Sequence, residues 1–86
     1  MTTDMIEKFV EADEHKGHLI NIHFKQRSTV TGLFIDTNDY KDLKAKNFWR
    51  IVPQTNVEQW RKTRNMNLAK IFNGTEFTKL AEAKKQ

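Results

Sequence analysis

The residues best suited to metal chemistry lie near the N-terminus. His15, His18 and His23 follow the acidic pair Asp13 and Glu14, and imidazole and carboxylate groups both bind transition metals. His18 and His23 are five positions apart, however, so in one extended strand their side chains would point to opposite faces. We interpret this cluster as a chance grouping and predict no metal site.

The sequence contains no recognisable pattern for nucleophilic catalysis. The chain has no cysteine, and its one serine, Ser28, has no neighbouring pattern of histidine and acid. A glycine-rich phosphate loop and a pair of catalytic carboxylates are also missing from the sequence. We therefore predict that the chain is not an enzyme and has no cofactor. Without cysteines there is no disulfide framework, so stability must come from packing or from association with other copies.

Charge is divided unevenly along the chain. Residues 1–14 have a net charge of −4, whereas the remaining 72 residues have a net charge of +8. Within residues 41–64, three large aromatic side chains, Phe48, Trp49 and Trp60, alternate with seven basic ones. The basic residues are Lys41, Lys44, Lys46, Arg50, Arg61, Lys62 and Arg64. This mixture is typical of surfaces that bind a nucleic-acid strand, but a solvated surface over a core that contains the aromatic residues fits it equally well.

The length of 86 residues predicts a single small domain, 1–86, with one modest core. The N-terminus is acidic and lacks the basic region and apolar run of a signal peptide. No apolar stretch approaches the roughly 20 residues that a membrane span requires. We therefore expect a soluble, cytoplasmic protein without a membrane partner.

The first half of the chain predicts a helix followed by strands. Residues 4–16 have the apolar stripe of a helix, capped by Asp4 and ending near Gly17. Ile20, Ile22 and Phe24 alternate with polar residues, as in a half-buried strand. A second strand over 29–36 contains Gly32, where the missing side chain permits bending or a close backbone approach. After a cluster of turn-forming residues at 36–39, we predict that a third strand starts near Tyr40 and carries Leu43 and Ala45 inward.

The segment 47–66 allows two interpretations. Either the third strand continues through Val52 and a fourth strand returns from about Arg61, or residues 57–64 form one or two helical turns capped by Asn56. We favour a long hairpin with a helical tip. A fourth strand over 68–72, an Asn73-Gly74 turn, a fifth strand over 76–80 and a polar tail at 81–86 complete the prediction. The expected fold is therefore mainly β with an N-terminal α-helix, its five short, bent strands forming a small open barrel.

Two glycine-centred motifs carry a family resemblance. The first lies within residues 18–46 and consists of Gly32, Phe34, Asn38, Tyr40 and Asp42. The second lies within 67–80 and reads Phe72-Asn73-Gly74-Thr75-Glu76-Phe77. In spacing and order these motifs resemble the two halves of the Sm signature of Sm, Sm-like and Hfq proteins, although Asn73 stands where archaeal and eukaryotic members have arginine. The resemblance implies a strongly bent, SH3-like open barrel of the Sm type.

The resemblance also implies an RNA site in the loops after Asp36 and around Asn73, which face the pore of a ring in that family. Tyr40 occupies the position of the aromatic residue that stacks on a base, Asp42 that of the base-reading asparagine, and Asn73 that of the arginine. The candidate RNA-binding set is completed by Asp39, Lys41 and Lys44. Because Asp42 and Asn73 depart from the family pattern, the base preference is left open. The alternative is that Tyr40 packs at a strand start and that the aspartates cap backbone amides.

In the resembled family, strand four of one subunit pairs with strand five of the next and closes a ring of six or seven. We predict a homo-oligomeric ring here as well, because a chain this small cannot bury all the apolar residues of both strands alone. The candidate interface residues are Leu68, Ile71, Phe72, Phe77 and Leu80. Two functions follow: a ring that binds single-stranded RNA, or a structural or protein-interaction oligomer that has lost the RNA pocket.

Overall fold

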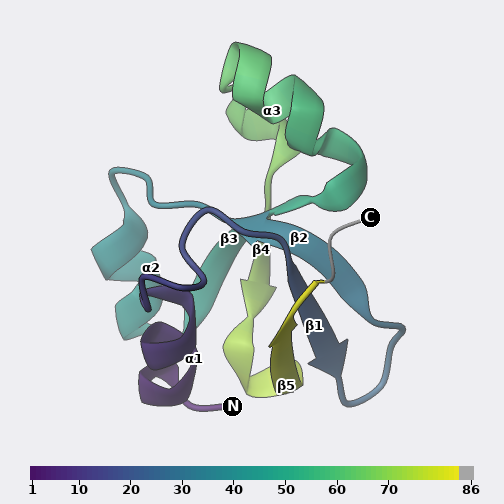
Figure 1. Cartoon of the computed structure of the whole chain (residues 1–86). Helices are drawn as coiled ribbons and strands as arrows, with labels where there is room; N and C mark the ends of the chain where they lie inside the picture. Colours follow the sequence, from purple (N-terminus) through teal and green to yellow (C-terminus); the bar gives the residue numbers. More distant parts are fainter. Residues whose placement is uncertain (84–86) are drawn as a thin grey trace.

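The computed structural model describes residues 1–83 and contains three α-helices and a five-stranded sheet (Figure 1). The helices are α1 (Thr3–Val10), α2 (Tyr40–Ala45) and α3 (Val57–Thr63). The strands are β1 (Ile20–Phe24), β2 (Val30–Phe34), β3 (Phe48–Pro53), β4 (Lys70–Asn73) and β5 (Phe77–Glu82). Short 3₁₀ turns, η1 (Gln54–Asn56), η2 (Met66–Leu68) and η3 (Gly74–Glu76), flank α3 and join β4 to β5.

The sheet has the order β4-β3-β2-β1-β5, and every neighbouring pair is antiparallel. Two strands separate β4 from β1 in this order, yet the rings of Phe24 and Phe72 lie with centroids 5.8 Å apart. The sheet must therefore be strongly curved. Among the described residues β4 and β5 do not pair with each other, so the sheet stays open and has two free edges.

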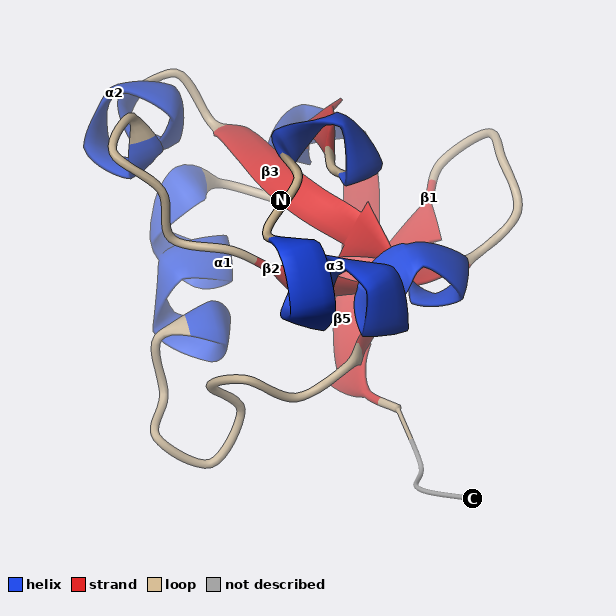
Figure 2. Cartoon of the chain, turned by 90° about the horizontal axis from the view of Figure 1, so that it is seen from above, coloured by secondary structure: helices blue, strands red, loops and turns tan. Residues whose placement is uncertain are grey.

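The core has two parts. The larger part lies between α1 and the concave face of the sheet, where Ile6 of α1 is fully buried against Trp49, Phe77 and their neighbours. The smaller part lies beneath α3, whose Val57 and Trp60 pack on β2 and β3. Consequently α3 projects at one end of the molecule, whereas α1 and α2 lie together at one side of the sheet (Figures 1 and 2). The prediction of an N-terminal helix and five strands is confirmed, although the bounds of several elements differ from those predicted.

The N-terminal helix is shorter than the predicted 4–16. Thr2, not Asp4, occupies the N-cap, and its hydroxyl accepts a hydrogen bond from the amide of Met5 at 3.3 Å. The helix ends at Val10, the last residue of its apolar stripe, and residues 11–17 form turns. Gly17 adopts a left-handed conformation (φ 75°) within these turns, as glycine readily does.

The prediction of a strand starting at Tyr40 is wrong. Residues 40–45 form α2, in which Ala45 is exposed and Leu43 is only partly buried. Asn47 follows in the left-handed region (φ 62°) and reverses the chain, so β3 begins only at Phe48. Contacts with α1 hold this short helix in place, which local sequence preference alone would not achieve.

The hairpin with a helical tip is confirmed for residues 47–66. β3 pairs with β4, and η1, α3 and η2 connect them. The returning strand starts at Lys70, later than either predicted start. Asn56 lies at the N-cap position of α3, but its amide instead donates to the carbonyl of Leu68 at 3.2 Å and ties the two ends of the tip together.

The Asn73-Gly74 turn is not the predicted two-residue hairpin. Gly74 begins the η3 turn, and the side chain of Asn73 accepts a hydrogen bond from the amide of Thr75 at 3.0 Å. β5 continues to Glu82, so residues 81 and 82 belong to this strand rather than to a tail. Ala83 follows the strand, and its amide donates to the carbonyl of Leu19 at 2.9 Å. Residues 84–86 of the predicted tail lie outside the described residues.

Candidate functional site

Tyr40 is the first residue of α2, and its side chain reaches both the residue after α1 and strand β3. Its hydroxyl donates a hydrogen bond to Glu11 Oε2 of the α1–β1 connection at 2.6 Å. Its ring makes an edge contact with Trp49, with centroids 6.0 Å apart, and Lys44 Nζ lies 5.0 Å from its centroid. Burial, followed by the hydrogen bond to Glu11, raises the pKa of Tyr40 well above its ordinary range. Tyr40 is therefore partly buried and already makes three contacts within the chain.

Lys44 is committed to carboxylates of the N-terminal segment. Its ammonium group forms ion pairs with Glu7 and with Glu11, the latter at 3.3 Å. The hydrogen bond from Tyr40, and then the contacts from Lys44, lower the pKa of Glu11, while that of Lys44 is raised chiefly by Glu7. These four side chains link α1 to α2, so Lys44 is not free to neutralise a phosphate backbone.

Asp39 is likewise occupied within the chain. It accepts a hydrogen bond from the Thr37 hydroxyl at 2.5 Å and another from Arg50 Nη2 at 2.5 Å. The Thr37 contact, and then the Arg50 contact, lower the pKa of Asp39. Arg50 is mostly buried, and its Nε has no hydrogen-bond partner among the described residues. Asp39 therefore orders the β2–α2 loop and pairs with a buried cation.

The remaining predicted RNA contacts do not form one constellation. Lys41 and Asp42 are exposed on α2, and no ion pair to either is found within residues 1–83. Asn73 lies past the C-terminal end of α2, where it pairs with Phe48 of β3 and caps η3. Of the six candidates, Tyr40 and Lys44 share Glu11 as a partner, and Asp39 pairs separately with Thr37 and Arg50. Lys41 and Asp42 form no ion pair in the described part of the chain, and Asn73 caps a turn.

The candidate interface residues divide into buried and accessible ones. Phe77 and Leu80 are buried in the core of their own chain, so any contact of β5 with another subunit would be made by its backbone edge and not by these two side chains. Leu68 packs partly under α3, and Phe72 packs partly on the main core. Ile71 of the edge strand β4 is 51% exposed and is the one member of the set that presents a large apolar surface.

The structure separates the basic and aromatic residues of segment 41–64. Trp49 and Trp60 are 1% and 5% exposed, so both are core residues. Lys44 and Arg50 are held in ion pairs. Five basic residues of this segment stay exposed and without an acidic partner in the described part of the chain: Lys41, Lys46, Arg61, Lys62 and Arg64. The last three lie within four positions at the end of α3, and we call them the basic tip.

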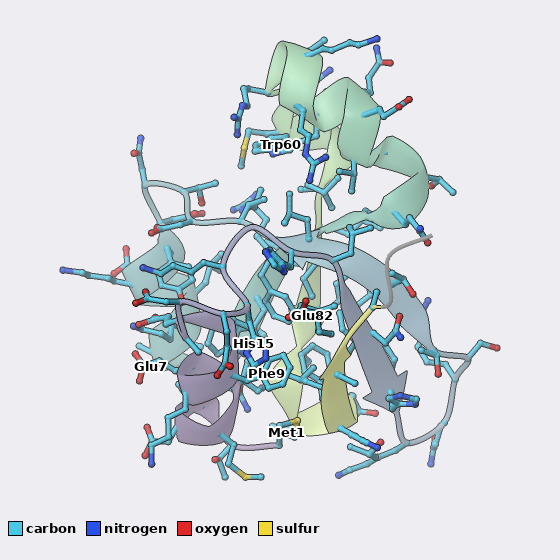
Figure 3. The ribbon with its side chains drawn as sticks, in the orientation of Figure 1. Met1, Glu7, Phe9, His15, Trp60 and Glu82 are labelled. Atoms are coloured by element: carbon cyan, nitrogen blue, oxygen red, sulfur yellow. The ribbon has the colours of Figure 1, made fainter. Side chains whose placement is uncertain are left out.

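The three histidines are not brought together. His15 stacks on Phe9 with ring centroids 3.9 Å apart (Figure 3). Both His15 and His18 approach Glu82 at the end of β5, at 3.9 and 2.9 Å. His23 lies elsewhere, beside the Thr29 hydroxyl. Within residues 1–83 no group of three or more histidine, aspartate or glutamate side chains has the geometry to hold a metal ion.

The sequence contained one signal for the contacts that were missed. Glu7 and Glu11 are four positions apart and so share a helix face, an arrangement that invites a cation from another element. Nothing local identified Lys44 and Tyr40 as the partners, because 29 or more residues separate each pair.

Comparison of the chain with protein-family models, curated proteins and solved structures finds no match. The likeness to Sm proteins therefore rests on the two sequence motifs alone. None of the helices among the described residues has the length and apolar character needed to cross a membrane.

Proposed function

We propose that this chain is a nucleic-acid-binding module that contacts the phosphate backbone through the basic tip. The observation that carries the proposal is that Arg61, Lys62 and Arg64 are all exposed, while the one acidic residue between positions 54 and 73, Glu58, forms no ion pair with them. Cations without an internal ion pair break no salt bridge when they bind phosphate, and release of counterions from the nucleic acid favours binding.

The tip is also held in a defined shape. Trp60 and Val57 anchor α3 to the sheet, and Thr63 and Asn65 accept hydrogen bonds from amides of the following turn. Arg64 ends the helix in a left-handed conformation (φ 56°, ψ 30°), a position where glycine is commonly found. Its guanidinium lies 5.5 Å from the ring centroid of Trp60, a contact that holds this arginine over the tip.

The test is fluorescence anisotropy with labelled 20-nucleotide oligo-U, oligo-A and a 20-base-pair DNA duplex, between 50 and 200 mM salt. Three phosphate contacts predict a loss of affinity of about 20-fold for single strands and about 40-fold for duplex over this range. Because Trp60 is buried and no base-stacking surface accompanies the tip, we expect little preference between the two single strands.

Two charge-matched variants locate the site. Arg61→Gln with Lys62→Gln removes two cations of the basic tip. Lys41→Gln with Lys46→Gln removes two exposed cations, one in α2 and one directly after it, near the pore site that the Sm resemblance implies. We expect the first variant to bind weakly with a flatter salt dependence and the second to bind almost normally. The reverse result would favour the Sm-type site. Equal losses of affinity in the two variants would show that binding depends on the overall positive charge and not on the basic tip.

Assembly into an Sm-like ring is a second candidate function. The observation that favours it is the open seam of the sheet, where β4 and β5 have free edges and a gap of about 310 Å³ is bordered by Phe24, Arg27, Ile71 and Phe72. An edge strand with an exposed apolar residue can extend its hydrogen-bonded ladder with a strand from another copy. In the ring, β4 of one copy would pair with β5 of the next.

Native mass spectrometry and light scattering test the ring. We expect a mass six or seven times that of one chain, and dissociation by Ile71→Lys. Met5→Lys is a matched control, because Met5 is similarly exposed (55%) but lies on α1. A monomeric mass at 100 μM would contradict the ring, and the exposed Lys70 and Lys79 would then be edge charges that prevent strand pairing.

A further inference from the structure

Helix α3 projects from one end of the molecule, and the N-terminus lies at the other (Figure 1). Its seven residues make about two turns, which extend for about 10 Å along the helix axis. An α-helix with its side chains is about 10–12 Å across, and the major groove of B-form DNA is about 12 Å wide. The size and position of α3 therefore allow it to enter this groove without any rearrangement of the sheet behind it.

The two sides of α3 differ in what they contact. Val57 and Trp60, three positions apart, face the sheet and are buried. By the same helical period Glu58, Gln59 and Lys62 lie on the opposite side, and all three are exposed. Their side chains make no hydrogen bond or ion pair within residues 1–83. The outer side of α3 therefore presents a carboxylate, an amide and an ammonium group that have no partner in this part of the chain.

These three kinds of side chain match the edges of base pairs in the major groove. There a glutamine amide pairs with N6 and N7 of adenine, a lysine pairs with O6 and N7 of guanine, and a carboxylate accepts from the N4 amino group of cytosine. Arg61 and Arg64 are also exposed and border the same side of the helix. The three cations of the basic tip against the one carboxylate of Glu58 give this surface a net charge of +2, which suits a polyanion.

Two other forms of nucleic acid fit this surface less well. A single strand binds largely by stacking its bases on aromatic rings, and the ring of Trp60 is buried under α3. The major groove of duplex RNA is deep and narrow, so side chains cannot reach its base edges. The shape of α3 and its side chains together favour B-form DNA.

We propose that α3 binds in the major groove of duplex DNA, with Gln59 and Lys62 at base edges and with Arg61 and Arg64 on phosphates. This inference rests on the proposed function, because it uses the basic tip. It adds the form of the nucleic acid and the groove that is contacted. Since α3 extends for about 10 Å and base pairs are about 3.4 Å apart, we expect a sequence preference over about three base pairs.

Fluorescence anisotropy at about 50 mM salt tests the form of nucleic acid and the groove. The probes share one mixed sequence and are plain duplex DNA, duplex DNA with glucosylated 5-hydroxymethylcytosine in place of cytosine, duplex RNA and single-stranded DNA. The glucose groups fill the major groove but leave every phosphate charge in place. We expect binding to each of the last three probes to be at least about tenfold weaker than to plain duplex DNA, because one good base contact alone is worth about that much.

Variants separate base contacts from phosphate contacts. Gln59→Ala should weaken binding to the sequence that the parent chain selects from a randomised duplex pool by about tenfold, without changing the slope of the salt dependence. Arg61→Gln should weaken binding to all sequences alike and reduce that slope by about one. Gln26→Ala is the matched control, because it removes an exposed amide from the β1–β2 connection, and it should have no effect. All three substitutions are at exposed side chains, so the variants should fold.

The possible failures are distinguishable. Absence of binding to every probe would overturn the proposed function and this inference with it. Equal binding to plain and glucosylated duplex DNA would place the contact outside the major groove, and tighter binding to duplex RNA or to the single strand would identify another form of nucleic acid. Either result would overturn this inference and leave the proposed function standing. Unchanged binding of Gln59→Ala to the selected sequence would show that α3 does not read bases, and would also overturn it.

Discussion

Gly74 of the second glycine motif is required by packing, and this can be tested by Gly74→Ala. An added Cβ at this position would overlap the amide oxygen of Asn47 and would lie 2.6 Å from Cδ1 of Ile6. Neither neighbour can easily move. Ile6 is fully buried, and the Asn47 amide accepts a hydrogen bond from Trp49 Nε1 at 2.8 Å and donates one to the Met1 carbonyl at 2.9 Å.

The size of the effect follows from these two contacts. Forcing one extra carbon into a packed core costs about 1–3 kcal/mol. Displacing the Asn47 amide would leave the buried indole N–H of Trp49 without its acceptor, at a further cost of about 1–3 kcal/mol. We expect Gly74→Ala to lower the free energy of unfolding by about 2–5 kcal/mol, a large part of the roughly 4–13 kcal/mol typical of a domain of this length.

Thermal and urea unfolding, with near-ultraviolet circular dichroism to monitor Trp49, measure this effect. The melting temperature should fall by at least about 8 °C. Gly17→Ala is the control, because Gly17 has a positive φ but no atom within 4 Å of the added Cβ, so only the backbone cost of about 1–2 kcal/mol applies. The tryptophan signal should change in the first variant and not in the second. If Gly74→Ala were the less destabilising of the two, the packing argument would be wrong.

Three further predictions concern the contacts of the sheet and of Tyr40. Gly32→Ala should destabilise by about 1–3 kcal/mol in urea unfolding, because its Cβ would lie 2.6 Å from Ile51 Cγ2 and 2.8 Å from the Val52 carbonyl oxygen. Tyr40→Phe should cost about 1 kcal/mol at pH 7 through loss of the Glu11 hydrogen bond. Because folding raises the pKa of Tyr40, the contribution of its hydroxyl to the free energy of unfolding is complete below about pH 10 and is lost at higher pH. The free energies of unfolding of the parent chain and of Tyr40→Phe should therefore converge in alkaline urea titrations. The pKa of Glu11 is lowered on folding, so its contribution is present above pH 4.5 and lost as the pH falls, and Glu11→Gln should flatten the acid side of the stability profile.

Local pattern was sufficient to predict much of the sheet. The alternation of Ile20, Ile22 and Phe24 identified β1, and Gly32 was correctly interpreted as a place of close backbone approach. Val57 and Trp60, three positions apart, gave the helical tip its apolar face. These features depend on side chains within a few residues of one another, which is the range over which sequence patterns are informative.

The position of Tyr40 could not be derived in the same way. Residues 40–45 are too few to show a helical period, and what determines their conformation lies on α1. The side chains that bind Tyr40 and Lys44 come from residues 7 and 11. Sequence spacing suggested an RNA site at Tyr40 because it depends only on position along the chain. It gives no sign that Glu11, Trp49 and Lys44 contact the same side chain in the fold.

These contacts of Tyr40 bear on where the proposed contact with nucleic acid would be made. A base stacked on Tyr40 would gain about 1–3 kcal/mol. To accept it, the ring would have to give up a hydrogen bond worth about 0.5–1.5 kcal/mol, an aromatic contact with Trp49 worth about 0.5–1.5 kcal/mol and a cation–π contact with Lys44 worth about 0.5–1 kcal/mol. The loss, about 1.5–4 kcal/mol in total, offsets the gain of about 1–3 kcal/mol, so stacking at Tyr40 offers little net advantage. Arg61 and Lys62 have no internal partners to lose, and for this reason the basic tip is the stronger candidate for the contact with nucleic acid.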